Sequence, residues 1–397
     1  MTNFEETKKQ FILPKGLIYL DGNSLGPMPK NVPSEISTLL HEEWSNLLIN
    51  GWNDAEWMFQ PENLGNKISR IIGAEDNSVV VGETLSVRVF QALSSAIKEV
   101  GKRKIILTDS GNFPSDLYMA QGLVHLLNDQ LEIRICAPEE VLDSLSDEIA
   151  VLMLTDVDYR TGRRHDISVI SKIAKDNGIV TIWDLAHSAG ALNLNLKEWD
   201  IDYAVGCTYK YLNAGPGSPA FIYVNPKKIN EVKPSLMGWL GHQKPFEFLH
   251  KYVPGKGINR MKIGTPPVLA NAALAASLKI WDTVNMSELR SKSIDLSERL
   301  IRGLQKNCPN LKLASPINAE DRGSQVSFYF EHGYPAMQAI IEKGVIGDFR
   351  SPNIMRFGIT PLYISKEDID LAIEVISNVI QNSLWDRPKY KKQKFVT

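Results

Sequence analysis

The sequence predicts an α/β fold, with a mostly parallel central sheet covered by helices on both faces and a smaller C-terminal α+β domain. From residue 64 to about 217, short apolar runs alternate with longer segments whose apolar residues recur at helical spacing, which is typical of a parallel sheet. After Asn225 this alternation gives way to Gly- and Pro-rich loops and then to long helices. We therefore expect an N-terminal arm and helix (1–48) packed on the small domain, a large domain (49–275) and a small domain (276–397).

Composition excludes several classes of protein. A chain of 397 residues, 43% hydrophobic and 23% charged, suffices for two soluble globular domains. Its formal net charge of -2 argues against a nucleic-acid or membrane-surface partner. The three cysteines lie far apart, the histidines show no metal-ligand spacing, and no signal peptide or membrane-spanning run is present. We expect a cytoplasmic protein without a metal.

The segments ahead of the large domain are expected to be an extended arm (1–17), a short strand (18–20), a glycine-rich turn (21–27), a helix (32–48) and a loop (50–54). Such a turn is often only a turn, but here Asn23 and Ser24 could offer polar groups to a small ligand. In the loop, Trp52 has two possible roles. Packing is the commoner role of a tryptophan, while a loop tryptophan can also form the wall of a pocket for an aromatic substrate.

In the large domain the pattern predicts helices over 64–72, 83–100, 117–127 and 167–176, and strands over 78–82, 104–108, 131–135, 149–154, 179–183 and 203–207, with a loop over 109–116. A helix over 267–281 is expected to lead into the small domain. There we expect helices over 287–306, 335–343 and 366–382, and strands over 325–330 and 354–357.

Two neighbouring strands deliver a carboxylate and a lysine to one edge of the expected sheet. One ends at Asp184, followed by His187, and the next leads to Tyr209 and Lys210. If both strands are parallel, this is the edge where open α/β sheets bind ligands. A lysine can hold pyridoxal phosphate as a Schiff base while a carboxylate keeps the pyridine nitrogen protonated. A structural ion pair is the commoner role of such residues, but their place at the strand ends favours the cofactor site.

Two further loops could contribute to this site. The strand–loop–helix junction with Thr84 and Ser86 is a candidate anion site, because helix N-termini present free N–H groups and a positive dipole. Either hydroxyl could instead simply cap the helix. In the next loop, Phe113 could stack on a planar ring, and Asp116 is an equally good helix cap.

Other catalytic motifs are poor matches. The run PGKG at 254–257 lacks the complete phosphate-loop pattern, GPG at 215–217 is no dinucleotide fingerprint, and no Gly-x-Ser-x-Gly elbow occurs.

Taken together, the motifs resemble the kynureninases, a family of fold-type-I pyridoxal-phosphate enzymes. The resemblance spans most of the chain, from about residue 19 to 363. The motifs that carry it are LDGNSLG at 20–26, NFPSD at 112–116, DLAH at 184–187, TYKYLNAG at 208–215 and GWLGH at 238–242, together with Arg356. One such match would be weak, but six in the family order are specific.

By this resemblance Lys210 would carry the cofactor and move the Cα proton, with Tyr209 as general acid–base and Asp184 paired with the ring nitrogen. The other implied cofactor contacts are Leu85, Ser86, Phe113, Ser115, Asp116, Thr155, His187, Tyr209, Trp239 and Thr265. Trp239 and Thr265 would come from the partner subunit of a homodimer with shared active sites. The implied substrate contacts are Ser24, Trp52 and Arg356, with Arg356 clamping the α-carboxylate.

The resemblance implies a PLP-dependent hydrolase that cleaves the Cβ–Cγ bond of L-kynurenine and releases anthranilate and L-alanine, in tryptophan catabolism by the kynurenine pathway that also serves NAD biosynthesis. Thr265 and Trp52 stand where animal members carry asparagine and histidine. Both residues look like the bacterial type, which favours kynurenine over 3-hydroxykynurenine. The resemblance gives Arg88 no role.

Two alternatives remain open on the sequence. One is a related enzyme of the same fold, an aminotransferase or a cysteine desulfurase, although a desulfurase needs a reactive cysteine on a mobile loop and none follows Cys308. The other is a dimeric, non-catalytic protein that kept the fold, against which the intact Lys210, Asp184 and Arg356 argue.

Overall fold

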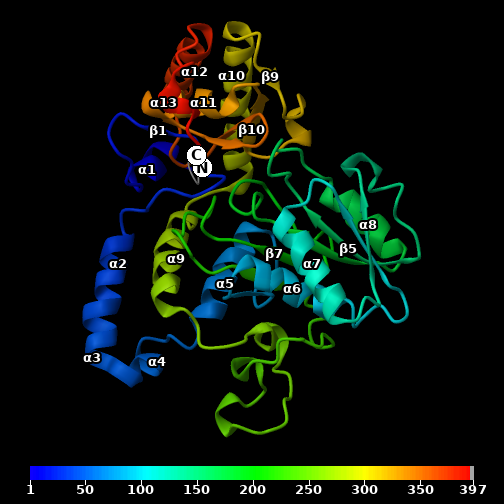
Figure 1. The fold of residues 1–397 in the computed structure, drawn as a ribbon. Coiled ribbons are helices and arrows are strands. Elements are labelled where there is room, and N and C mark those ends of the chain that lie inside the picture. Colours follow the sequence, from blue (N-terminus) through cyan, green and yellow to red (C-terminus); the bar gives the residue numbers. More distant parts are fainter. Residues whose placement is uncertain (394–397) are drawn as a thin grey trace.

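The computed structural model of the protein describes residues 1–393. A large sheet with its helices occupies the middle of Figure 1, and a smaller α+β region lies above it. The chain between them passes through a loop-rich segment, about 230–265, that projects at the bottom of the view.

The large sheet has seven strands in the order β2-β8-β7-β6-β5-β3-β4. Their bounds in this order are Val79–Val81, Phe221–Val224, Tyr203–Gly206, Val180–Asp184, Ile149–Thr155, Ile105–Asp109 and Glu132–Cys136. Six strands run parallel, and β8, which the sequence analysis did not include, is antiparallel to both its neighbours. The central strands are continuous apolar runs because helices cover both faces of the sheet.

Helices lie on both faces of this sheet, as expected. The helices around it are α5 (Gln60–Ile71), α6 (Leu85–Ala96), α7 (Pro114–Leu126), α8 (Ile167–Asp176) and α9 (Val268–Trp281). Apolar residues of α6 and α7 pack with one set of alternating strand residues, including Met153 and Ile182. Those of α5, α8 and α9 pack with the opposite set, including Leu154 and Trp183. The predicted α/β architecture is confirmed.

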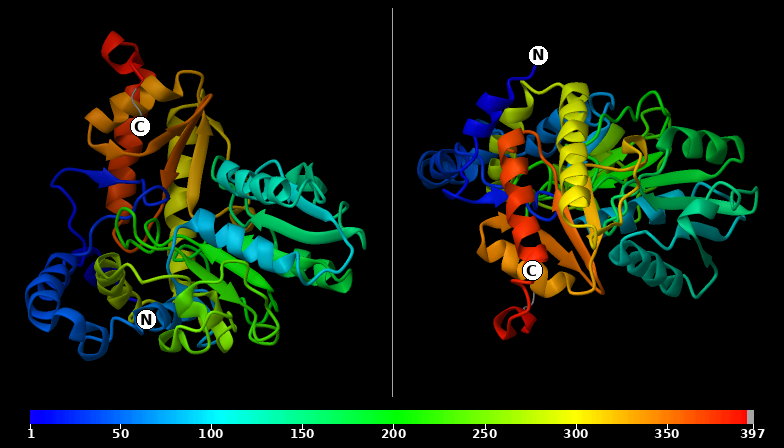
Figure 2. Two further views of the ribbon diagram at one scale, coloured as in Figure 1. Left: turned by 60° about the horizontal axis from the view of Figure 1, so that its bottom comes forward. Right: turned by 90° about the horizontal axis from the view of Figure 1, so that it is seen from above.

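The C-terminal region is built on an antiparallel sheet with the order β12-β13-β10-β9, whose strands are Asp348–Arg350, Ile354–Gly358, Gln325–Tyr329 and Lys312–Leu313. Its helices are α10 (Met286–Asn307), α11 (Gly333–Glu342), α12 (Lys366–Gln381) and α13 (Pro388–Lys391). The long helices α10 and α12 lie side by side (Figure 2). The three predicted helices and two predicted strands are confirmed, whereas β9, β12 and α13 were not predicted.

The first residues of the chain are not the extended arm that we expected. They contain the helix α1 (Phe4–Lys9). Asn3 caps it by accepting a hydrogen bond from the Glu6 N–H (3.2 Å), and acidic residues in the first turn and lysines in the last suit the helix dipole. Further on, β1 (Ile18–Tyr19) pairs in parallel with β11 (Val345–Ile346) of the C-terminal region.

The helix expected over 32–48 is confirmed and has three stretches: α2 (Val32–Thr38), a π-helical stretch (Leu39–Trp44) and α3 (Ser45–Leu47). Its stretch α2 lies along α9, where the Asn31 side chain donates to the Ala276 carbonyl (3.0 Å). The loop expected over 50–54 is instead a short helix, α4 (Gly51–Asp54). There Trp52 packs edge-on against Trp57, with ring centroids 5.6 Å apart.

Among residues 1–393, no helix is both long and apolar enough to cross a membrane.

Candidate active site

The candidate site lies where three parallel strands end side by side. In the register of the sheet, Thr155 at the end of β5 is the neighbour of Asp184 at the end of β6, and Asp184 is in turn the neighbour of Val205 in β7. The chain leaving β7 then reaches Tyr209 and Lys210. The parallel direction of these strands, which we expected from the sequence, therefore brings the carboxylate and the lysine to one edge.

Lys210 is at the centre of this cluster. Its Nζ lies 3.1 Å from Nε2 of His187, 5.9 Å from the centroid of the Phe113 ring and 5.8 Å from that of Tyr209. Burial lowers the pKa of the lysine, and the negative charge of Asp184 partly offsets that effect. An amine with a lowered pKa is more often uncharged and therefore more nucleophilic towards an aldehyde.

Two buried carboxyl groups, those of Asp184 and Asp116, accompany the lysine. Burial raises the pKa of Asp184 to about 6, against the opposing effect of Lys210, and one of its oxygens accepts a hydrogen bond from the Ala186 N–H (2.8 Å). Burial and then the charge of Asp184 raise the pKa of Asp116 well above its ordinary value. The Asp116 Oδ2 and the His187 Nδ1 are buried without a hydrogen-bond partner among the residues that the structure describes. Such orphaned polar atoms indicate a place for a polar ligand.

The N-termini of α6 and α7 meet next to this cluster. The second residues of these helices, Ser86 and Ser115, hold their hydroxyl oxygens 2.9 Å apart. Thr84 is the residue that caps α6, since it accepts a hydrogen bond from the Val87 N–H (3.5 Å). Ser86 is therefore not a helix cap, and with the N–H groups around Leu85 it could hold an anion.

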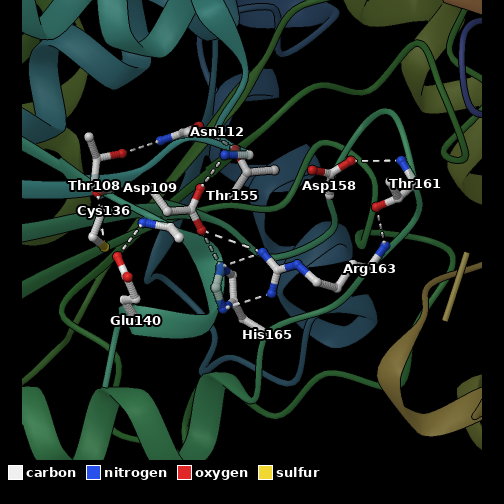
Figure 3. Close-up of polar contacts among 12 residues, drawn as sticks. Thr108, Asp109, Asn112, Cys136, Glu140, Thr155, Asp158, Thr161, Arg163 and His165 are labelled. Carbon is white, nitrogen blue, oxygen red and sulfur yellow. Dashed lines mark hydrogen bonds and ion pairs between the residues drawn. The ribbon is translucent and has the colours of Figure 1, made fainter. Parts of the chain in front are cut away.

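Asn112 links the neighbouring loops, and the sequence analysis gave it no role of its own. Its amide oxygen accepts hydrogen bonds from the Phe113 N–H (2.7 Å) and the Thr155 hydroxyl (2.5 Å). Its amide nitrogen donates to the Thr108 hydroxyl (3.0 Å) and to the Met153 carbonyl (3.2 Å). Asn112 and its contacts with Thr108 and Thr155 are drawn in Figure 3. All the hydrogen-bonding capacity of this buried amide is used to fix the backbone before Phe113.

Arg356 reaches the same region from β13. It is buried, and its charge acts on both Lys210 and His187. Its Nη2 donates to the Ser24 hydroxyl (3.0 Å), so the structure brings together two of the predicted substrate contacts. Its other partners include Asp348, which the sequence analysis missed because no motif or apolar pattern marks the short strand β12.

Three predicted site residues lie apart from this cluster. Trp239 is 40% exposed on the projecting segment, where it stacks with Phe248 at 6.4 Å between ring centroids. Trp52 and Thr265 line a separate, largely apolar pocket of about 440 Å³ with Trp44. Within residues 1–393, no hydrogen bond or ring contact joins any of the three predicted residues to Lys210.

Arg88 is fully buried and bonds mainly to backbone carbonyl groups. Its Nε donates to the Gly82 carbonyl (3.0 Å), and its Nη1 donates to the Met261 carbonyl (2.8 Å) and to the Gln91 side chain (2.6 Å). It therefore ties the loop before α6 to the segment that leads to Thr265.

Three comparisons place the chain among known proteins. A family model described as the kynureninase C-terminal domain matches residues 289–376. The kynureninase of Deinococcus radiodurans is 44% identical over 381 residues, covering 94% of this chain and 92% of that protein. The kynureninase of Pseudomonas fluorescens is 40% identical over 397 residues, covering 98% of this chain and 95% of that protein.

Solved structures share the fold. A cysteine desulfurase from Thermococcus onnurineus superposes with a TM-score of 0.81 at 18% identity, covering 95% of this chain and 98% of its own. A C-DES mutant with glycine covalently linked to the PLP cofactor superposes with a TM-score of 0.79 at 17% identity, covering 94% and 99%. The expected fold type is confirmed. On its sequence identity over nearly the full length, the chain belongs to the kynureninase family.

Proposed function

We propose that this protein hydrolyses L-kynurenine to anthranilate and L-alanine, using pyridoxal phosphate held on Lys210. The observation that carries the proposal is the convergence of Lys210, Asp184 and Arg356 at one site in a chain of the kynureninase family. The reaction is a step of tryptophan catabolism.

The residues present fit the cofactor. Lys210 offers a buried amine with a lowered pKa, and the neighbouring Asp184 suits a protonated ring nitrogen. The face of Phe113 is close to Lys210, and the paired hydroxyls of Ser86 and Ser115 at two helix N-termini suit a phosphate. When bound, pyridoxal phosphate supplies an electron sink that stabilises negative charge on the substrate carbon atoms.

Each side chain then has a defined task. Lys210 takes the proton from the substrate Cα and returns it, while His187 orients the amine through its Nε2. Arg356 binds the substrate α-carboxylate. Burial raises the pKa of the Tyr209 phenol, so this group stays protonated and acts as a proton donor rather than as a base.

The structure disfavours a desulfurase. Such an enzyme needs an accessible thiolate. Cys207, which is close to Lys210 in sequence, is buried, and burial raises the pKa of its thiol. Cys308 is buried as well, and Cys136 is partly buried with a thiol pKa raised by burial.

We further propose a cytoplasmic homodimer with shared active sites, in which Trp239 and Thr265 reach the partner's cofactor and Trp52 lines the substrate-ring pocket. The support is their position away from Lys210 of the same chain. In addition, Trp239 lies in an exposed aromatic cluster with Phe246 and Phe248. Exposed apolar clusters of this kind are typical of protein interfaces.

The test is to add L-kynurenine to the cofactor-loaded protein and to follow anthranilate fluorescence and alanine release, with 3-hydroxykynurenine in a parallel sample. Equal amounts of anthranilate and alanine are expected, with kynurenine the better substrate. Transfer of the amino group to an oxo acid without anthranilate would identify an aminotransferase instead. A protein that binds the cofactor but converts neither substrate would contradict the proposal.

A further inference from the structure

The guanidinium of Arg356 is held by a carboxylate on the adjacent strand. Asp348 and Arg356 are directly opposite each other in the antiparallel pair of β12 and β13, and both side chains are buried. Arg356 Nε donates to Asp348 Oδ1 (2.6 Å), and Nη2 donates to Oδ2. The two parallel hydrogen bonds fix the plane of the guanidinium as well as its position.

Two more groups complete this arrangement. The Ser24 hydroxyl accepts from Arg356 Nη2 (3.0 Å) and donates to Asp348 Oδ2 (2.6 Å), so it bridges the pair. Arg350 Nη2 lies 3.0 Å from the same Asp348 oxygen. On the other side of the guanidinium, the Tyr159 carbonyl accepts from Nη1. These contacts use four of the five N–H groups of Arg356 and leave one N–H of Nη1 for a ligand.

The charged side chains around Arg356 have a net positive charge, which one bound anion would neutralise. Arg356 and Arg350 carry two positive charges, and Asp348 supplies one negative charge. Asp21 is also nearby, but burial and then the charge of Asp348 raise its pKa to about 7, so it is at most partly ionised at neutral pH. A substrate carboxylate would restore neutrality. Asp348 therefore orients Arg356 without cancelling the positive charge of the site.

We propose that Asp348 is a positioning residue that holds Arg356 in the orientation needed to bind the α-carboxylate of an amino-acid substrate, with Arg350 supplying the balancing positive charge. The inference rests on the proposed function for the identity of the substrate.

The experiment uses the cofactor-loaded protein and the substitution Asp348→Asn. Loss of a charged, bidentate support is expected to raise KM for L-kynurenine about tenfold or more, whereas kcat changes less than about threefold. The matched control is Asp370→Asn, since Asp370 makes the same two-bond contact with Arg299 on the surface (Nη2–Oδ2 2.7 Å). The control is expected to leave KM unchanged.

A second readout separates this proposal from the proposed function. Binding of L-alanine and of L-alaninamide is followed through the absorbance of the bound cofactor, which requires no turnover. Asp348→Asn is expected to weaken binding of L-alanine about tenfold and to leave that of L-alaninamide unchanged. If the wild type binds alanine in this way but releases no anthranilate, the proposed function fails while the role of Asp348 stands.

Two results would overturn the inference: an unchanged KM in Asp348→Asn, or an equal loss of affinity for the carboxylate and the amide ligand. If Asp348→Asn does not fold, Ser24→Ala removes the bridging hydroxyl while keeping both charges. This variant is expected to weaken alanine binding about threefold and to spare alaninamide. If Ser24→Ala then binds L-alanine as tightly as the wild type does, and L-alaninamide likewise, the result counts against the proposal.

Discussion

Two buried polar clusters lie at the same edge of the seven-stranded sheet, and they differ in how completely their atoms are paired. One contains Lys210, His187 and Asp184, and the other contains Asp109, His165 and Arg163. Each combines at least one carboxylate with a histidine and a cation. Because the two clusters contain the same kinds of residue, the difference in how their polar atoms are hydrogen-bonded can distinguish a structural cluster from a functional one.

In the second cluster, both oxygens of Asp109 are used. Oδ1 accepts a hydrogen bond from the Gly111 N–H (2.9 Å), and Oδ2 lies 2.6 Å from Nε2 of His165 and 3.5 Å from Nη2 of Arg163. Figure 3 shows His165 and Arg163 converging on this carboxylate. A network with its atoms paired in this way supports the fold and has no vacancy for a ligand.

In the Lys210 cluster, Asp116 Oδ2 and His187 Nδ1 lack partners among the described residues, and the pKa values of Asp184, Asp116 and His187 are all displaced, mainly by burial. Unpaired buried atoms and displaced pKa values together indicate a functional site. The comparison teaches that a buried acid and histidine are not sufficient evidence of a site. The state of their hydrogen bonds separates the two roles.

The largest effect is expected from Lys210→Ala, which removes the amine on which the cofactor is held and the Cα proton is moved. Anthranilate release should fall by about a thousandfold or more. Stopped assays of anthranilate fluorescence at saturating cofactor measure this directly. Lys262→Ala, at the lysine paired with Glu62 outside the Lys210 cluster, is a control that should not reproduce that loss.

Replacing one acid of each cluster by asparagine, in separate variants, tests the comparison of the two clusters. Asp184→Asn should lower kcat about a hundredfold, because the cofactor ring loses its carboxylate partner, with little loss of stability. Asp109→Asn should instead lower the free energy of unfolding by about 3 kcal/mol, because it breaks a buried ion pair. Its kcat per folded molecule should stay within about threefold of the wild-type value. Denaturant melts and steady-state kinetics on both variants measure the two effects. The same pattern in both variants would remove the distinction between the clusters.

The raised pKa of Asp184 also predicts how stability depends on pH. Between its ordinary value near 3.8 and the folded value of about 6, the folded protein binds more protons than the unfolded chain. This group therefore favours folding at low pH, and its contribution declines as the pH rises from about 4 to 6. In cofactor-free protein, Asp184→Asn should gain about 3 kcal/mol relative to the wild type above pH 6. Thermal melts at pH 5 and pH 7 measure this difference, and an identical pH dependence for both proteins would refute the prediction.

The smallest effect concerns substrate choice. Thr265→Asn should raise the ratio of kcat/KM for 3-hydroxykynurenine over kynurenine about threefold, because an amide offers the ring hydroxyl a further hydrogen-bonding group. Thr283→Asn, the same change at an exposed site at the end of α9, is the matched control. A ratio that moves equally in both variants would exclude a role for Thr265 in specificity.

The sequence predicted much of this arrangement for physical reasons that can be stated. Buried parallel strands read as apolar runs, so the positions of Asp184 and Lys210 at one sheet edge followed from strand ends alone. The role of Arg356 required the family resemblance, since an arginine on a strand carries no such information by itself.

The features that the sequence analysis did not predict depend on contacts between residues that are separated in the sequence. Asp348 becomes significant only when β12 pairs with β13, and β12 has three residues and no apolar alternation. The helix α4 around Trp52 forms where this residue packs on Trp57, so a local reading of its glycine and asparagines predicted a loop. Asn112 becomes significant through hydrogen bonds to Thr155 and Met153, which lie about forty residues away in the chain.

The most direct test of the account is to locate the cofactor covalently. The cofactor-loaded protein is reduced with borohydride, digested, and its peptides are analysed by mass spectrometry. The account predicts a reduced pyridoxyl-phosphate group on the peptide with Lys210 and its loss in Lys210→Ala. A modification on any other lysine, or none despite bound cofactor, would contradict the assignment of this edge of the sheet as the active site.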